Sequence, residues 1–307
     1  MNSKNSNHAG VRAVVFDISG TVLDYGCLGP VTAFVELFAR HGVSISTEEA
    51  RRPMGTHKRD HIWTVLSDVS LAARWKAANG SLPTRDLLDS LCAEFAPLQI
   101  EVLKNFCDLI PGVPQLVSEL RRRGIKIANT TGFESSMIAN LIPRAVEAGY
   151  VSDLWVCPDQ VGKGRPAPWM IFHAARELGI YPLSTFVKVG DTPADVAEGH
   201  AAGTWVVSVV NSGNEVGLSH PELTALPTSV REAKIQAAHA KLAACKPHYI
   251  IDTVADLMPV LEEISDRIVH GETPSPAKFT TPISNDSRVY PPSARVSGSG
   301  LQPAQVA

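Results

Sequence analysis

The chain has 307 residues, 44% of them hydrophobic and 19% charged, so it can bury one large core or a core with a smaller domain, which excludes a fibrous or wholly disordered protein. Its formal charge of -3, with acidic and basic residues interspersed, provides no basic field for nucleic acid or an anionic membrane and favours a small-molecule partner. The five cysteines are scattered and include no Cys-x-x-Cys pair, so we predict reduced thiols. The opening segment has no apolar signal, and no apolar run approaches the ~20 residues that span a bilayer, so we predict a cytoplasmic protein.

Short apolar runs typical of strands alternate along the chain with amphipathic segments typical of helices. This alternation indicates a parallel sheet covered by helices. The predicted strands are 11–17, 124–131, 153–157, 186–191, 204–210 and 248–252. We therefore assign the chain to the α/β class, with a Rossmann-like parallel sheet core.

The first two predicted strands are separated by about a hundred residues that contain helical patterns and no convincing strand, far more than a βα crossover needs. We predict a helical cap over 26–104, inserted into a core formed by 11–25 and 105–270. The segments 1–10 and 271–307 are predicted to be disordered. The second of these is rich in Pro, Ser, Thr and Gly and has too few aliphatic residues to order itself.

Helices after the cap have recognisable ends in the sequence. Gly112, Val113 and Pro114 open a helical pattern that finishes in three arginines, and Pro168 opens another. Beyond the fifth strand we predict a polar loop over 211–222. Helices near 228–244 and 253–269 then complete the core.

Polar residues stand where predicted strands end, which is where ligands bind in an open parallel sheet. Asp17 closes the first strand before a Gly-containing turn with free N–H groups, so it is a candidate nucleophile for a phosphoryl group. Thr131 and Asp191 end two later strands. Two carboxylates repel unless a hard cation lies between them, and Asp17, Asp191 and the Ser19 carbonyl form an oxygen set that suits Mg²⁺. Asp195, one helical turn after Asp191, is placed to support this site.

A basic residue is also expected at this edge of the sheet. Arg165 precedes a helix, and its guanidinium can pair with both Asp17 and a phosphoryl oxygen. Lys163, two residues earlier, is the competing candidate.

Ser19 occupies an informative position two residues after Asp17. An enzyme that cleaves a P–O ester with this arrangement usually keeps a second Asp there, which protonates the departing oxygen. A serine at this position indicates a leaving group other than oxygen.

These motifs resemble a known family. The stretches FDISGT (16–21), GRPAP (164–168) and GDTPAD (190–195), with Thr131, are similar to the motifs of the haloacid-dehalogenase superfamily. The cap stretch RRPMGTHKRDH (51–61) resembles that of the phosphonoacetaldehyde hydrolases, or phosphonatases. The combined resemblance spans about 11–270. There are three departures: Ser19 stands where Ala is more usual, Phe133 stands where Tyr is expected, and the tail after 270 is additional.

The resemblance implies a Mg²⁺-dependent hydrolysis of phosphonoacetaldehyde to acetaldehyde and phosphate, in a homodimer joined through cap helices. Asp17 would be the nucleophile, and Lys58 would form a Schiff base with the aldehyde. The implied roles of the other residues are metal binding by Asp17, the Ser19 carbonyl and Asp191, phosphoryl contact by Thr131 and Arg165, orientation by Asp195, and formation of the Lys58 pocket by Met54, Gly55 and His61.

The chemistry agrees with this resemblance. Direct cleavage of a C–P bond would leave a poorly stabilised carbanion, whereas an iminium accepts those electrons and becomes an enamine. A second Asp then has no task. A working Lys58 needs a pKa about 2–3 units below its ordinary value, which burial under a closed cap near Arg165 can supply. His61, three residues on, would share its helix face and could relay a proton.

Three alternatives remain open at this point. One is a phosphatase or phosphomutase of the same superfamily, which would need another acid in place of the missing Asp. A dehalogenase is disfavoured because it has no use for the metal-binding stretch around Asp191. The third is an inactive binding scaffold, against which the set Asp17, Lys58, Arg165 and Asp191 argues.

Overall fold

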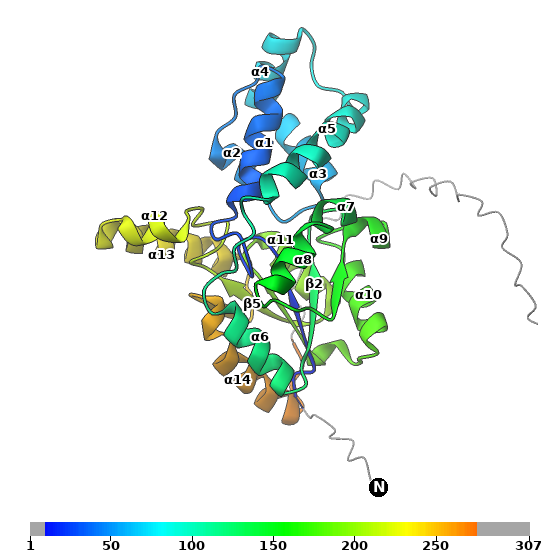
Figure 1. The fold of residues 1–307 in the computed structure, drawn as a ribbon, viewed down its shortest axis with the longest axis vertical. Helices are drawn as coiled ribbons and strands as arrows, with labels where there is room; N and C mark the ends of the chain where they lie inside the picture. The colour runs from blue at the N-terminus through cyan, green and yellow to red at the C-terminus, as the bar shows by residue number, and fades with distance from the viewer. Residues whose placement is uncertain (1–9, 275–307) are drawn as a thin grey trace, which may run out of the picture. The chain divides into compact units, whose positions relative to one another are not determined.

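The computed structural model describes residues 10–274, and its centre is a six-stranded parallel sheet (Figure 1). The order across the sheet is β3-β2-β1-β4-β5-β6, and every neighbouring pair is parallel. The strands are β1 (Ala13–Phe16), β2 (Lys126–Thr130), β3 (Leu154–Val156), β4 (Phe186–Gly190), β5 (Trp205–Val209) and β6 (Tyr249–Ile251). This architecture confirms the predicted α/β class, and each strand lies inside a predicted range.

The sheet carries a hydrophobic core on both faces, which is why its strands are continuous apolar runs rather than alternating ones. Val14 and Phe16 of β1 pack into one cluster, to which α6 (Val113–Arg122) and α14 (Leu257–Val269) contribute. Ala13 and Val15 point the other way, into a second cluster with α10 (Trp169–Leu178). Because both faces of the sheet are covered, polar residues that could bind a ligand lie at the ends of the strands.

The remaining helices complete the core. They are α7 (Ser135–Ile138), α8 (Leu141–Glu147), α9 (Pro158–Val161), α11 (Pro193–Ala202), α12 (His220–Ala225), α13 (Thr228–Ala244) and the short 3₁₀ turns η1 (Leu183–Thr185) and η2 (Val254–Asp256). Two details differ from the sequence prediction. The expected polar loop over 211–222 ends early, because Ser219 and Glu222 form a capping box that starts α12. The regular part of the last helix begins at Leu257 rather than 253, after η2.

Six helices lie between β1 and β2, and the first five of them fall within the range 26–104 predicted for the cap (Figure 1). These five are α1 (Leu28–Arg40), α2 (Thr47–Arg51), α3 (Lys58–Leu66), α4 (Val69–Asn79) and α5 (Arg85–Leu103). Stacked rings of Phe34 and Phe95, with centroids 4.5 Å apart, join α1 to α5. The helical insertion is therefore confirmed, whereas the exact domain limits stay a prediction.

The segments predicted to be disordered, 1–10 and 271–307, lie outside the described residues except for residue 10 and residues 271–274. Across residues 10–274, none of the helices combines the length and the apolar character that crossing a bilayer requires.

Candidate active site

A small cavity lies beyond the carboxyl end of β1, between residues of the core and residues of the cap helices. Its volume is about 20 Å³, which is room for roughly one water molecule. Six predicted site residues are among those that line it. The lining residues are Asp17, Ser19, Cys27, Pro30, Met54, Gly55, Lys58, Thr131, Gly132, Phe133 and Thr192. Any larger ligand requires the lining to move apart.

Three buried carboxylates meet beside this cavity. Oxygen atoms of Asp17, Asp191 and Asp195 all lie within 4.8 Å of one another. Burial, and then the charge of Asp195, raises the pKa of Asp17 to about 6. Burial and the other two carboxylates raise the pKa of Asp191 well above its ordinary value. The folded chain therefore holds more negative charge here than it can stabilise by itself.

Asp191 is fixed by hydrogen bonds and by close backbone packing. Thr21 Oγ1 donates to its Oδ1 at 2.8 Å, and the Asn214 backbone N–H donates to its Oδ2 at 2.7 Å. A Cβ at Gly20 would lie 2.4 Å from Asp191 Oδ2, and one at Gly213 would lie 2.8 Å from Asp191 Cβ. Only glycine leaves space at these two positions. The result is a fixed set of hard oxygen ligands that fits a divalent cation such as Mg²⁺.

Arg165 is the basic residue that the structure brings to Asp17. Its side chain is fully buried, and Nη1 lies 2.7 Å from Asp17 Oδ1 and 2.9 Å from Asp195 Oδ1. Its Nε lies 2.9 Å from Glu198 Oε2, so the guanidinium is held from two sides. Lys163, the competing candidate, is exposed.

Lys188 and Glu198 also belong to this buried network, and the sequence interpretation missed them. Lys188 Nζ lies 2.9 Å from Asp195 Oδ1 and 3.3 Å from Glu198 Oε2, and it donates to Thr130 Oγ1 at 2.9 Å. The available signal was a lysine within the apolar run of β4. Counted with Arg165, two cations face four carboxylates, those of Asp17, Asp191, Asp195 and Glu198. A divalent cation would offset the two remaining negative charges.

Lys58 begins α3 and is only 4% exposed, although lysines are normally solvated. Its Nζ lies 4.7 Å from the centroid of the Phe133 ring and 5.7 Å from that of Phe34. Burial lowers the pKa of Lys58 to about 8. The charges of Cys27 and Asp17 raise this pKa, and the charge of Arg165 lowers it. A useful fraction of this amine is therefore neutral near neutral pH.

His61 is close to Lys58 but is not among the residues that line the cavity. Its ring stacks on Phe34 with centroids 3.7 Å apart, and its Nε2 lies 2.8 Å from the Ala50 carbonyl oxygen, to which it must donate. Burial lowers the pKa of His61 well below its usual range, and the positive charge of Lys58 lowers it further. The structure thus places a neutral histidine behind Phe34.

The cap segment before α3 approaches the core without a gap. Gly55 has a φ of 85°, and a Cβ there would lie 2.3 Å from Thr192 Oγ1. A Cβ at Gly132 would lie 2.3 Å from the Thr56 carbonyl oxygen. The Gly55 carbonyl accepts a 3.3 Å hydrogen bond from Arg165 Nη1. This segment, which also carries Met54, therefore closes the cavity over Asp17 and Thr131.

The parallel sheet, the strand-end carboxylates and the inserted helices define a haloacid dehalogenase-like hydrolase, and the family model of that description matches residues 11–203. The chain is 40% identical over 267 residues to a phosphonoacetaldehyde hydrolase of Nitratidesulfovibrio vulgaris, covering 87% of this chain and 95% of the relative. It is 39% identical over 254 residues to a Bacillus cereus protein of the same name, covering 83% and 96%. The chain therefore belongs to the phosphonoacetaldehyde hydrolase family.

Solved structures agree with this assignment. A phosphonoacetaldehyde hydrolase-like protein from Oleispira antarctica is 37% identical, with a TM-score of 0.85, over 89% of this chain and all of that one. A β-phosphoglucomutase from Clostridium difficile, at 15% identity and a TM-score of 0.63, shares the fold only.

Proposed function

We propose that the protein hydrolyses the C–P bond of phosphonoacetaldehyde to acetaldehyde and phosphate. The observation that carries the proposal is that one small cavity is lined both by the Asp17 carboxylate and by the Lys58 amine, whose pKa is lowered to about 8. A phosphatase needs the first group but has no use for the second. The names of the 37–40% identical relatives support the same substrate.

Lys58 would open the reaction. Its neutral Nζ adds to the aldehyde carbon, and the hydroxyl group of the adduct takes up one proton from solvent and leaves as water, which gives an iminium. An oxygen of Asp17 then attacks phosphorus while the C–P bond breaks, and the electrons of that bond move into the iminium to form an enamine. Protonation of the enamine carbon and hydrolysis release acetaldehyde and restore Lys58, and water cleaves the aspartyl phosphate to phosphate and Asp17.

The surrounding residues position these groups. Arg165, held by Asp195 and Glu198, would orient Asp17 and bind a phosphoryl oxygen together with Thr131. Asp17, the Ser19 carbonyl and Asp191 would hold Mg²⁺, which supplies positive charge where the phosphoryl group and the nucleophile meet. Phe34, with His61 stacked on its ring, would lie beside the Lys58 amine, and Met54 and Gly55 would cover the cavity.

The size of the cavity requires a conformational step. About 20 Å³ cannot hold a two-carbon phosphonate, so the cap segment around Gly55 has to separate from the core to admit substrate. Its closure would keep bulk water from the iminium.

A direct comparison of substrates tests the proposal. Phosphate should be released from phosphonoacetaldehyde but not from ordinary phosphate esters of similar size. Release from esters would favour a phosphatase or phosphomutase, and release from neither, with Mg²⁺ present, would favour an inactive scaffold.

Replacing Ser19 with Ala should leave turnover of phosphonoacetaldehyde within a few-fold of the wild-type value. Only the backbone carbonyl of Ser19 has a part in the proposal, and alanine keeps that carbonyl. Steady-state phosphate release measures the effect. Thr21→Ala is the matched comparison, because it removes the hydrogen bond to Asp191 Oδ1 and should cost more. A thousandfold loss in the Ser19 variant would show that its hydroxyl takes part in the chemistry.

The reactivity of Lys58 should follow a pKa of about 8. Since only the neutral amine reacts, the rate of acetylation by acetic anhydride should rise about tenfold per pH unit below 8 and level off above it. Mass spectrometry of the peptide that contains Lys58 gives the rate, with exposed Lys163 as an internal reference for reagent consumption. A Lys58 rate that is still rising tenfold between pH 9 and 10 contradicts the lowered pKa.

Two further expectations belong to this proposal. The family resemblance suggests a homodimer, and light scattering should then give twice the chain mass of 32.9 kDa. The cytoplasmic location predicted from the sequence would be tested by fractionation of cells that produce the full chain.

A further inference from the structure

Arg51, the last residue of α2, reaches from the helical insertion to the loop that follows β5. Its Nη1 donates to the Gly26 carbonyl oxygen at 2.8 Å, and its Nη2 donates to the Gly217 carbonyl oxygen at 3.1 Å. A Cβ at Gly217 would lie 2.8 Å from the Arg51 guanidinium carbon. One side chain thus joins the start of the cap to the loop 211–217.

Asn214 lies at the centre of this loop and is tied to Arg51 in both directions. Arg51 Nη1 donates to the Asn214 side-chain oxygen at 3.2 Å and to its backbone carbonyl at 3.4 Å. The Asn214 amide Nδ2 donates back to the Arg51 carbonyl at 3.4 Å. Asn214 is only 2% exposed. Arg51 therefore contacts both the side chain and the backbone carbonyl of Asn214.

The same residue holds a candidate metal ligand. The Asn214 backbone N–H donates to Asp191 Oδ2 at 2.7 Å. The neighbouring Ser212 adds a second connection, because its Oγ donates to the Gly20 carbonyl at 2.7 Å, and its own carbonyl accepts from the Gly26 N–H at 2.7 Å. The turn after Asp17, the entry to the cap and the loop that holds Asp191 thus form one hydrogen-bonded unit.

We infer that Arg51 is a positioning residue that makes the metal-binding geometry of Asp191 depend on contact between α2 and the core. The inference rests on the proposed role of Asp191 in the preceding section. When α2 separates from the core, the three hydrogen bonds that Arg51 Nη1 and Nη2 make to Asn214 and Gly217 are lost. The loop is then free to carry the Asn214 N–H away from Asp191. By linkage, metal binding and cap closure favour each other.

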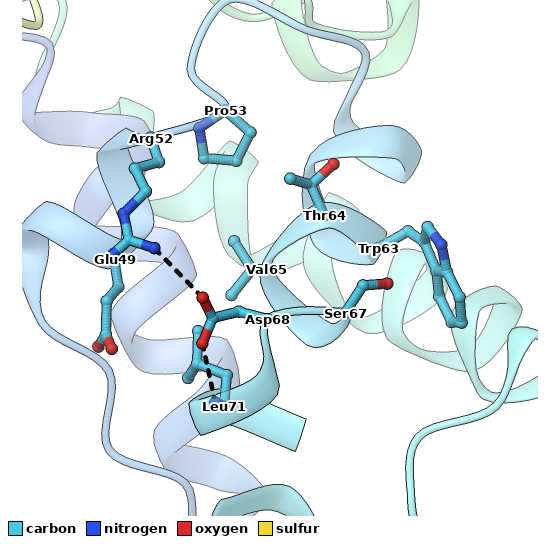
Figure 2. A pocket seen from close by; sticks show the side chains of 9 residues that line it. All are labelled: Glu49, Arg52, Pro53, Trp63, Thr64, Val65, Ser67, Asp68 and Leu71. Atoms are coloured by element: carbon cyan, nitrogen blue, oxygen red, sulfur yellow. Dashed lines mark hydrogen bonds and ion pairs between the residues drawn. The ribbon is translucent and has the colours of Figure 1, made fainter. Parts of the chain in front are cut away.

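Arg52 is a matched control from the same segment. Figure 2 shows its guanidinium pairing with Asp68, at 3.3 Å, beside a cavity of about 330 Å³ whose lining residues all belong to the helical insertion. The Arg52 side chain is 59% exposed. Replacing Arg52 removes the same side chain from the neighbouring position without disturbing the loop around Asn214.

The test is Mg²⁺ binding in the absence of substrate, measured by isothermal titration calorimetry on the full chain. Arg51→Ala should weaken Mg²⁺ binding at least tenfold, the range seen when residues that orient metal ligands are removed. Arg51→Lys should fall between the wild type and Arg51→Ala, because one ammonium cannot reach all the carbonyls. Arg52→Ala should stay within twofold of the wild type.

The outcomes separate this inference from the proposed function. If the wild type binds Mg²⁺ and folded Arg51→Ala binds it equally well, Arg51 has no positioning role although the metal site stands. If the wild type does not bind Mg²⁺, both fail. Should Arg51→Ala not fold, Asn214→Ala decides instead, since it keeps the N–H to Asp191 but removes the side-chain link, and unchanged Mg²⁺ affinity there overturns the inference.

Discussion

Asp17→Asn should reduce the release of phosphate from phosphonoacetaldehyde by at least about 10⁴-fold, the scale on which loss of a catalytic nucleophile acts. An amide is not a nucleophile toward phosphorus, and no other residue that lines the cavity offers a carboxylate. Phosphate release under saturating substrate and Mg²⁺ measures the effect. Asp252→Asn is the matched control, because Asp252 is an exposed residue of the α/β domain, and this variant should retain wild-type activity.

The same substitution should not destabilise the fold at neutral pH. The pKa of Asp17 is raised to about 6 in the folded state, mainly by burial, so its charge opposes folding at every pH above that value. Removing the charge relieves repulsion from Asp191 and Asp195, while Arg165 keeps Asp195 and Glu198 as partners. A melting temperature at pH 7.5 equal to or above that of the wild type, together with lost activity, would identify a chemical defect. Activity within tenfold of wild type would place the nucleophile elsewhere.

Much of the fold could be predicted because its elements are locally marked. Strands buried on both faces are apolar runs in any sequence, and all six were recognisable for that reason. The long interval before 124–131 was enough to indicate an inserted helical region. The order of the strands depends on pairing between distant segments, which no local pattern encodes. The start of α12 was missed because its capping box lies in a polar stretch typical of loops.

The candidate site divides in the same way. Asp17, Thr131 and Asp191 could be identified because each follows a strand, and parallel strands bring their carboxyl ends to one edge. Glu198 lies on α11, one turn after Asp195, and nothing in the sequence shows that it faces Arg165. The contacts of Arg51 with the core could not be predicted, because its partners are mostly backbone carbonyls, which have no sequence signature.

Lys58→Arg should abolish both turnover and covalent trapping. With wild-type enzyme and phosphonoacetaldehyde, borohydride should reduce the imine and leave a two-carbon group on Lys58, which mass spectrometry of the peptide detects. Arginine keeps the positive charge under the Phe133 ring but has no amine that can form an imine. We expect no adduct at position 58 and a loss of phosphate release of at least about 10³-fold, because the C–P bond then has no electron acceptor.

Two comparisons make the Lys58 result decisive. Lys188 is equally buried, but its Nζ contacts Asp195, Glu198 and Thr130, so it should not be labelled in the same experiment. Asp17→Asn should still form the adduct, because imine formation precedes attack on phosphorus, and the two-carbon fragment in that variant should still carry its phosphoryl group. Phosphate release that persists in Lys58→Arg, or an adduct found only on another lysine, contradicts the mechanism. An adduct that loses its phosphoryl group in Asp17→Asn would instead show that a group other than Asp17 accepts it.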